Sequence, residues 1–215
     1  MNFSSPTVAQ VFAEYERRAA EERVKAAALG PRVFAHLDEF LLPVGAEAGA
    51  VLHSLILARR PARLLELGTS YGYSTLILAD AARQVGGRLV TMDLADYKQA
   101  EARRMIGKAG LPDCVEFRLG DAVTLIKADA GPPFDFVLLD IWKELYVACL
   151  EAVYPRLASE GMIAADNMIE PPEARSSARA YRIAVAALPD MQSTLLPIGS
   201  GIELSVRWPA GHSKL

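Results

Sequence analysis

The chain has 215 residues, of which 52% are hydrophobic and 23% are charged, and its formal net charge at pH 7 is −3. These values exclude a disordered chain and argue against a dedicated nucleic-acid-binding protein, and the length predicts one domain, residues 1–215, that buries its own core. The first residues lack the pattern of a signal peptide, and no apolar run reaches the roughly 20 residues that span a bilayer, so we expect a cytoplasmic protein without a membrane segment.

Residues 1–60 are predicted to form helices that cover the rest of the domain. Apolar side chains recur at helical spacing over 7–29, where a Gly-Pro pair ends the pattern; a short helix over 34–42 and a third helix after Gly45 follow. Because all three precede the first predicted strand, they are an N-terminal addition to the core, residues 61–215. We expect them to cover the core or to form a dimer contact; the alternative is that they also wall a substrate site.

From residue 61 the pattern changes to strands and helices in alternation. Strands are predicted at 63–67, 88–93, 115–118, 134–140 and 161–166, and helices at 74–84, 97–108, 122–128, 144–158 and 173–188. Continuous apolar strands separated by helices predict a parallel sheet that is covered on both faces. Two further strands, 193–198 and 202–207, are separated by only three residues and should form an antiparallel hairpin. The predicted fold class is therefore α/β, a mostly parallel seven-stranded sheet with an antiparallel C-terminal edge.

The turn after the first strand is the first candidate ligand site. Its sequence, LELGTSYGYS, has Glu66 inside the strand, Gly68 in the turn and Ser74 at the start of the next helix, where we expect Ser74 to be the N-cap. The third glycine of the dinucleotide fingerprint is missing, and an acid at this position suits a cationic amino group better than a pyrophosphate. Asp93, at the end of the second strand, is expected to accept the hydroxyls of a ribose. The alternative is a tight turn beside a solvated acid.

Acids also follow the third, fourth and fifth strands. Asp121 either caps the helix that starts at Ala122 or contacts an adenine amino group. Asp140 ends the fourth strand, and Asp166 and Asn167 end the fifth, so neighbouring strands would bring three oxygen donors to one mouth of the sheet. Oxygen donors without paired His or Cys predict a hard-cation site, with Mg²⁺ favoured over Mn²⁺ or Ca²⁺. The alternative is that these acids only cap the helices that follow them.

At these positions the sequence resembles the metal-dependent class I S-adenosylmethionine (SAM) O-methyltransferases, the group of the catechol and caffeoyl-CoA O-methyltransferases. The segment LELGTSYGYS is similar to the cofactor turn of that family, and LDIWKELY and AADN are similar to its catalytic and metal-binding segments. The likeness runs from Val44 to Met168 and continues more weakly through the final hairpin. It implies a Rossmann-like fold, an enzyme that uses SAM and Mg²⁺ or another divalent cation, and a homodimer formed through the N-terminal helices or the hairpin.

Carried over position by position, the resemblance implies a role for each candidate residue. Those that would hold SAM are Val44 at its methionine end, Glu66, Gly68, Ser74, Asp93, Asp140, and around its adenine Asp121, Ala122 and Trp142. Asp140, Asp166 and Asn167 would bind Mg²⁺. Lys143, three residues beyond Asp140, would be the general base that takes a proton from one hydroxyl of a small vicinal-diol aromatic molecule. The predicted reaction is SAM-dependent O-methylation of a catechol-like acceptor.

Two departures from the family leave the acceptor open. Ile141 stands where the catechol enzymes have a polar residue, and no acid near Met191 matches the carboxylate that grips the second hydroxyl; Gln192 is the nearest candidate. One alternative keeps the SAM site but methylates a nitrogen or an isolated hydroxyl without metal. Another is a non-catalytic binding protein or a nucleotide-binding oxidoreductase, and the missing third glycine disfavours the oxidoreductase.

Overall fold

Seven strands form one mixed sheet in the order β3-β2-β1-β4-β5-β7-β6 in the computed structural model, which describes residues 1–209. The strands are β1 (Arg63–Leu67), β2 (Arg88–Asp93), β3 (Val115–Leu119), β4 (Phe134–Leu139), β5 (Leu157–Ala165), β6 (Met191–Leu196) and β7 (Ile202–Arg207). Strands β1 to β5 run parallel, whereas β7 pairs antiparallel with both β5 and β6. The predicted α/β sheet with an antiparallel C-terminal edge is confirmed.

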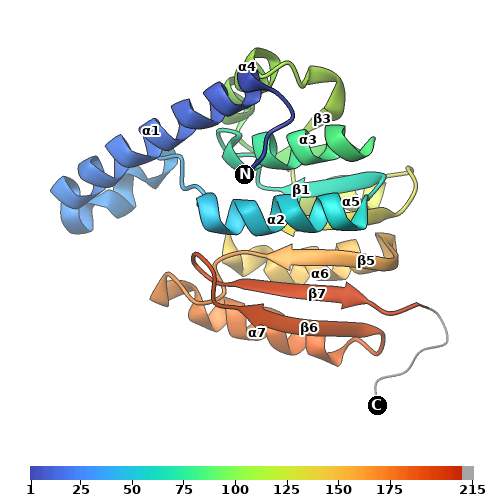
Figure 1. Cartoon of the computed structure of the whole chain (residues 1–215). Coiled ribbons are helices and arrows are strands. Elements are labelled where there is room, and N and C mark those ends of the chain that lie inside the picture. The colour runs from blue at the N-terminus through green and yellow to red at the C-terminus, as the bar shows by residue number, and fades with distance from the viewer. Residues whose placement is uncertain (210–215) are drawn as a thin grey trace.

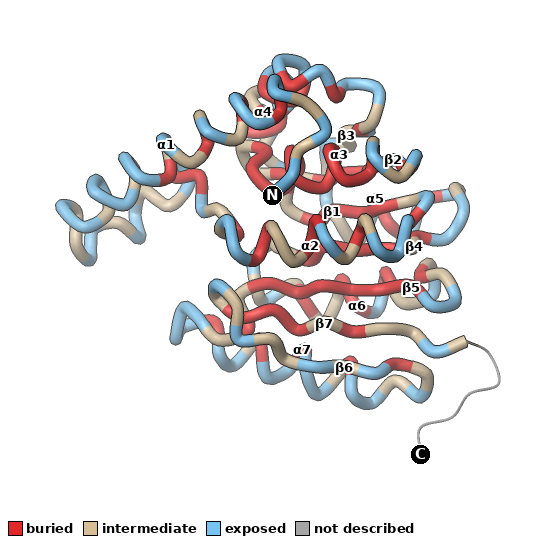
Figure 2. Tube along the Cα trace, in the orientation of Figure 1, coloured by how far each residue is buried: buried red, intermediate tan, exposed pale blue. Residues whose placement is uncertain are grey.

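Helices cover both faces of this sheet (Figure 1). The α-helices are α1 (Pro6–Leu29), α2 (Ala46–Arg59), α3 (Tyr73–Val85), α4 (Asp96–Lys108), α5 (Ala122–Ala128), α6 (Tyr146–Val153) and α7 (Arg175–Ala187). Short 3₁₀ segments are η1 (Gly30–Glu39), η2 (Pro112–Cys114), η3 (Lys143–Leu145), η4 (Tyr154–Arg156) and η5 (Pro172–Ala174). Successive side chains of a strand point to opposite faces of the sheet. Leu64 packs with α2 and α3 on one face, and Leu65 packs with α6 and α7 on the other. Figure 2 shows the central strands buried along most of their length.

The N-terminal arm, which is the second half of α1 together with η1, extends beyond the body of the molecule (Figure 1). Its surface is mostly exposed or intermediate in Figure 2, and Val24 and Phe34 are 72% and 63% exposed. The short helix predicted over 34–42 is present only in part, because the helical segment runs from Gly30 to Glu39 and is a 3₁₀ helix. No side chain caps this segment and none of its residues is buried, so nothing holds it as a regular α-helix.

The predicted helix over 144–158 is also interrupted. Its regular part, α6, ends at Val153, and Pro155 lies in the 3₁₀ turn that follows, where its ring prevents the helix from continuing. Strand β5 consequently begins at Leu157, earlier than predicted, and its pairing with β4 shifts register between Phe134 and Phe136.

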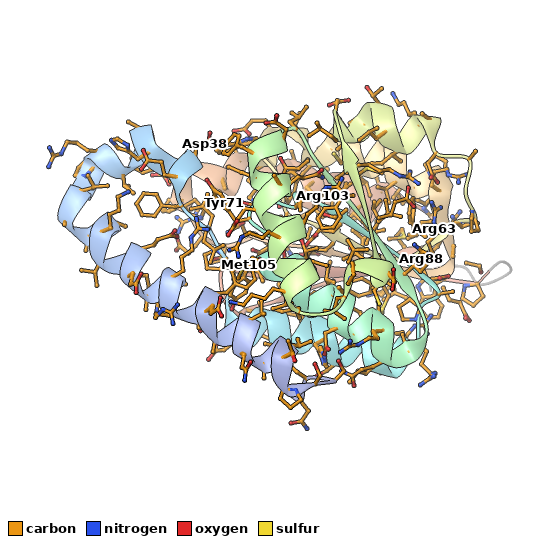
Figure 3. All side chains as sticks on the ribbon, turned by 90° about the horizontal axis from the view of Figure 1, so that it is seen from above. Asp38, Arg63, Tyr71, Arg88, Arg103 and Met105 are labelled. Atoms are coloured by element: carbon orange, nitrogen blue, oxygen red, sulfur yellow. The ribbon has the colours of Figure 1, made fainter. Side chains whose placement is uncertain are left out.

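The strand order reverses at the β1–β4 pair, and in open α/β sheets a crevice lies at the carboxyl edge of such a switch point. From β1 the chain moves outward to β2 and β3, and it then returns to the other side of β1 to form β4. The loops that follow β1 and β4 therefore diverge, which is where open α/β sheets bind ligands. In Figure 3, Arg63 and Arg88, which begin β1 and β2, lie at one end of the sheet, and Tyr71, which follows β1, lies at the opposite end near Asp38.

None of the helices within residues 1–209 combines the length and the apolar character that crossing a membrane requires.

Candidate active site

The turn after β1 packs directly against the loop after β4. The Asp140 amide donates a hydrogen bond of 2.9 Å to the Leu67 carbonyl, and a Cβ atom on Gly68 would lie 2.0 Å from the Asp140 carbonyl oxygen. Gly68 has φ +102°, a conformation that L side chains rarely adopt. Only glycine fits at this position. The predicted cofactor turn and the predicted metal-binding loop are therefore in direct main-chain contact.

Glu66 is a fully buried carboxyl group beneath this turn. Its Oε2 accepts hydrogen bonds from the hydroxyls of Thr75 (2.5 Å) and Thr91 (2.6 Å), whereas Oε1 has no hydrogen-bond partner within residues 1–209. Burial raises the pKa of Glu66 to about 7, although the nearby hydroxyls of Ser74, Thr75 and Thr91 act to lower it. A buried carboxylate oxygen that the chain leaves unpaired fits a cationic amino group.

Ser74 is not the N-cap that the sequence predicts. Helix α3 begins one residue earlier, at Tyr73, and its N-cap is Gly72 in the left-handed conformation, with no side-chain capping bond. A Cβ on Gly72 would lie 2.8 Å from the Tyr15 hydroxyl and 2.9 Å from the Cβ of Ala102, so this turn also requires glycine. The Ser74 hydroxyl therefore does not cap the helix, and instead it helps to lower the pKa of Glu66.

Asp93 is oriented by two main-chain amides. Its Oδ2 accepts from the Ser70 amide at 2.7 Å, and its Oδ1 accepts from the Ala95 amide at 2.8 Å. Because each carboxylate oxygen has a second lone pair, both remain able to accept a hydroxyl of a ligand. The geometry is therefore suitable for the ribose contact predicted from the sequence.

The residues predicted to surround adenine lie at the surface of the molecule. Asp121 is exposed and caps α5, accepting bonds from the amide (2.8 Å) and hydroxyl (2.7 Å) of Thr124, so the capping interpretation is confirmed. Ala122 begins α5 and is half-buried, and Trp142 is 59% exposed. Val44, predicted at the methionine end, is buried in the loop before α2.

Two acidic side chains gather where β4 and β5 end. Asp166 is buried, and its Oδ1 has no hydrogen-bond partner in the described part of the chain. Burial, and next the negative charge of Asp140, raise the pKa of Asp166 to about 7. A cation would stabilise such a pair, because it removes the repulsion and supplies the missing partner. This donor set fits a hard metal ion.

The third proposed metal ligand is an amide. Asn167 is half-buried and adopts a left-handed backbone with φ +58° immediately after Asp166. Across residues 1–209, no group of three or more His, Cys, Asp or Glu side chains could hold a metal ion. A site here would therefore depend on the side-chain oxygen of Asn167 in addition to the two carboxylates.

Lys143, the predicted base, begins η3 directly above these acids. Its side chain is 16% exposed, and its Nζ lies 3.1 Å from Asp140 Oδ1 and 2.8 Å from the Tyr146 hydroxyl. The structure thus brings Glu66, Gly68, Asp140, Lys143 and Asp166 to one edge of the sheet, because they lie at or just beyond the carboxyl ends of the adjacent strands β1, β4 and β5.

The sequence did not reveal that the N-terminal arm is fastened to this crevice. Asp38 in η1 pairs with Lys98 Nζ at 2.7 Å, its carbonyl accepts from the Tyr71 hydroxyl at 2.9 Å, and its carboxylate bonds the Tyr97 hydroxyl. Figure 3 shows Asp38 beside Tyr71, which lies inside the cofactor turn. A single acid in a polar segment carries no signal from which these contacts could have been predicted.

The turn of the C-terminal hairpin also belongs to the site. The amides of Met168 and Ile169 donate to the carbonyls of Gly201 (3.0 Å) and Ser200 (2.9 Å), so this turn covers the segment after Asn167. The Gly-Ser-Gly sequence predicted a turn, but it did not predict the contact of this turn with Met168 and Ile169.

The suggestion that Gln192 grips the substrate is wrong. Gln192 pairs with Val206 near the start of β6, beside Arg59 and Glu160. Since β7 is antiparallel to β5, and β6 is antiparallel to β7, this end of β6 lies at the edge of the sheet opposite the crevice.

The reversed strand order, the glycine turn after β1 and the acids after β4 and β5 define a Rossmann-like methyltransferase. More particularly, the family model described as O-methyltransferase matches residues 27–208, and the chain belongs to that family.

Individual relatives agree with this assignment. A catechol O-methyltransferase of Mycobacterium tuberculosis is 38% identical over 129 residues, which are 60% of this chain and 58% of that protein. Caffeoyl-CoA O-methyltransferase 1 of Eucalyptus globulus is 29% identical over 186 residues, 78% and 75% of the two chains. The match to the catechol enzyme therefore spans less than two thirds of its length. The structure of an O-methyltransferase from Bacillus cereus in complex with SAH superposes with a TM-score of 0.72 at 26% identity, over 92% of this chain and 90% of that chain.

Proposed function

We propose that this chain transfers a methyl group from SAM to one hydroxyl of a small vicinal-diol aromatic molecule, assisted by Mg²⁺ and by Lys143 as general base. One observation carries the proposal. Within residues 1–209, two buried carboxylate oxygens of this crevice have no hydrogen-bond partner, Glu66 Oε1 and Asp166 Oδ1, and Lys143 pairs with Asp140, the acid that ends the strand next to Asp166. The first suits the amino group of the cofactor, and the second suits a divalent cation.

The cofactor would be held along the carboxyl edge of β1, β2 and β4. Glu66 and Ser74 would bind the amino end, with Val44 nearby, and Asp93 would accept the ribose hydroxyls from an orientation that its two amide bonds already set. Gly68 and Asp140 would form the wall between cofactor and acceptor, and the adenine would lie among Asp121, Ala122 and Trp142. SAM supplies a sulfonium methyl group as the electrophile.

The metal would be held by Asp140, Asp166 and Asn167, all of them oxygen donors suited to Mg²⁺. Bound there, the ion supplies Lewis-acid polarisation that lowers the pKa of the acceptor hydroxyls. Lys143 would remove the proton from the hydroxyl to be methylated, and the oxygen would attack the methyl carbon as its bond to sulfur breaks and S-adenosylhomocysteine leaves. Holding the two reactants in line is worth on the order of 7–11 kcal/mol in favourable cases, and the close packing of the two loops at Gly68 serves that purpose.

The aromatic diol is proposed from the names of the relatives, since catechol and caffeoyl-CoA enzymes are both similar to this chain. A homodimer is proposed on the family resemblance alone.

The test is methyl transfer from SAM to catechol and caffeate, with Mg²⁺ and then with excess EDTA. We expect EDTA to reduce the rate at least 100-fold and added Mg²⁺ to restore it, since an ion that activates the nucleophile contributes several kcal/mol. Turnover that EDTA leaves unchanged would contradict the metal site and favour a metal-independent acceptor. If no turnover is seen, calorimetry with SAM identifies the reason. Absence of SAM binding would mean that the cofactor site is wrong, and SAM binding without turnover would mean that the acceptor is wrong.

A further inference from the structure

We propose that Tyr146 is a positioning residue that, together with Asp140, aims the amine of Lys143 at the methyl acceptor. The inference rests on the proposed function, because it takes Lys143 as the base. It starts from the contacts of a single buried hydroxyl group at the beginning of α6.

The Tyr146 hydroxyl has three polar neighbours, although its residue has no exposed surface. It receives a hydrogen bond from Lys143 Nζ at 2.8 Å, and it lies 3.0 Å from the Leu139 carbonyl and 3.1 Å from the Asp166 carbonyl. A phenol has one proton, and this hydroxyl donates it to one of the two carbonyls, which can only accept. Toward Lys143 the hydroxyl is therefore an acceptor.

Two acceptors then determine how the lysine amine is oriented. A neutral amine has two N–H bonds and one lone pair, arranged tetrahedrally with the carbon chain. Asp140 Oδ1 at 3.1 Å and the Tyr146 hydroxyl at 2.8 Å each accept a hydrogen bond from this amine, and together they use both N–H bonds. The lone pair is left in the single remaining direction. Since a base removes a proton only along its lone pair, these two contacts select where Lys143 can act.

The hydroxyl is itself held rigidly. The ring of Tyr146 packs edge-on against Tyr181, with ring centroids 5.7 Å apart, inside the core cluster beneath α6 and α7. Its two carbonyl neighbours end β4 and follow β5, next to Asp140 and Asn167. One oxygen atom thus ties the base to both strand ends that carry the proposed metal ligands, which keeps these groups in register.

The first experiment compares Tyr146→Phe with Tyr181→Phe. The first variant keeps the buried ring and removes only the oxygen, and we expect kcat with catechol to fall about 10- to 100-fold, because misplacing a catalytic group by about 1 Å has such an effect. The KM for SAM and the calorimetric Kd for SAM should stay within twofold. Tyr181→Phe is the matched control, since that buried hydroxyl has no hydrogen bond to Lys143 within residues 1–209, and its kcat should stay within twofold.

A double variant separates positioning from a general structural role. If Tyr146 acts through Lys143, adding Tyr146→Phe to Lys143→Ala should cause no further loss of kcat. A further loss of the size seen in the wild-type background would mean that Tyr146 acts by another route, and would overturn the inference.

A second readout does not depend on activity. In a crystal structure of Tyr146→Phe, we expect Lys143 Nζ to leave its place beside Asp140 or to occupy several rotamers. A lysine that keeps one conformer beside Asp140 would overturn the inference whatever the activity. Wild-type protein that binds SAM but methylates no diol would instead contradict the proposed function, and the crystallographic comparison would still decide the role of Tyr146.

Discussion

Glu66 is the residue whose environment says most about the ligand. Its Oε2 is satisfied by two threonine hydroxyls, while Oε1 is buried without a partner in the described part of the chain. Leaving a buried polar atom unpaired destabilises the folded protein by about 1–3 kcal/mol. A ligand that donates a hydrogen bond to Oε1 would remove this penalty. The pKa of about 7 follows from the same burial.

We predict that SAM binding weakens as the pH falls below about 7, because protonated Glu66 presents no charge to the amino group. The Glu66→Gln variant carries an uncharged side chain at this position at every pH. Its affinity for SAM at pH 8 should be about 10- to 100-fold lower, as a charge-assisted hydrogen bond is worth about 1.5–3 kcal/mol. Calorimetry at pH 6 and pH 8 checks both statements. If the variant binds SAM at pH 8 as the wild type does, Glu66 does not contact the amino group.

At the scale of elements, Gly68 in the site and Gly107 in a surface helix have opposite roles. Gly68 joins β1 to the turn where a side chain would collide with the main chain of Asp140. Gly107 lies in the last turn of α4 with open space around its Cβ position, so it weakens its helix without any packing reason for a glycine.

We therefore predict opposite effects for two identical substitutions. Gly68→Ala should lower the free energy of unfolding by about 2 kcal/mol or more, because it combines a strained backbone with a clash that only main-chain movement relieves. Gly107→Ala should raise it by about 0.5–1 kcal/mol. Urea unfolding of the two variants measures the difference, and a loss of equal size in both would refute the argument.

Over the whole molecule, one buried carboxylate joins distant parts of the chain. Asp129, after α5, accepts two hydrogen bonds from Arg63 of β1 at 2.8 and 2.9 Å, one from Arg118 of β3 at 2.7 Å and one from Arg156 of η4 at 3.0 Å. The hydrogen bonds from these guanidinium groups, that of Arg63 first, hold the pKa of Asp129 well below its usual range. In Figure 3, Arg63 lies at the end of the sheet opposite Tyr71, so this cluster is separate from the crevice.

The depressed pKa predicts acid sensitivity. A carboxyl group whose pKa is lower in the folded state contributes stability that is complete above its unfolded value, about 3.9, and is lost as the pH falls toward the folded value. Asp129→Asn should therefore destabilise the protein by about 3 kcal/mol or more at pH 7, since three arginines lose their counter-charge. The difference from wild type should shrink below pH 4. Urea unfolding at pH 7 and at pH 3 tests this; a constant difference would show that Asp129 contributes no pH-dependent stability.

Much of the fold could be predicted because its signals are local. Apolar runs, helical periodicity and breakers such as the Gly-Pro pair act over a few residues, and they located all seven strands to within a few residues. Glu66, Asp140 and Asp166 could be recognised for a related reason. In parallel sheets every carboxyl end lies at the same edge, so polar residues that follow different strands lie near one another. This proximity can be predicted without knowing how the side chains pack.

Only the tertiary structure decided the contacts between distant segments, because the local sequence of these segments does not predict them. The bond from Tyr71 to Asp38 joins residues 33 apart, and the one from Tyr146 to Asp166 joins residues 20 apart. Gln192 was misplaced because its position follows from the antiparallel pairing of the last strands and not from its neighbours in sequence. By itself the sequence determined the sheet and the chemical groups along its edge; chain folding decided which oxygens are left unpaired and which hydroxyl holds the base, because burial and orientation are properties of the packed molecule.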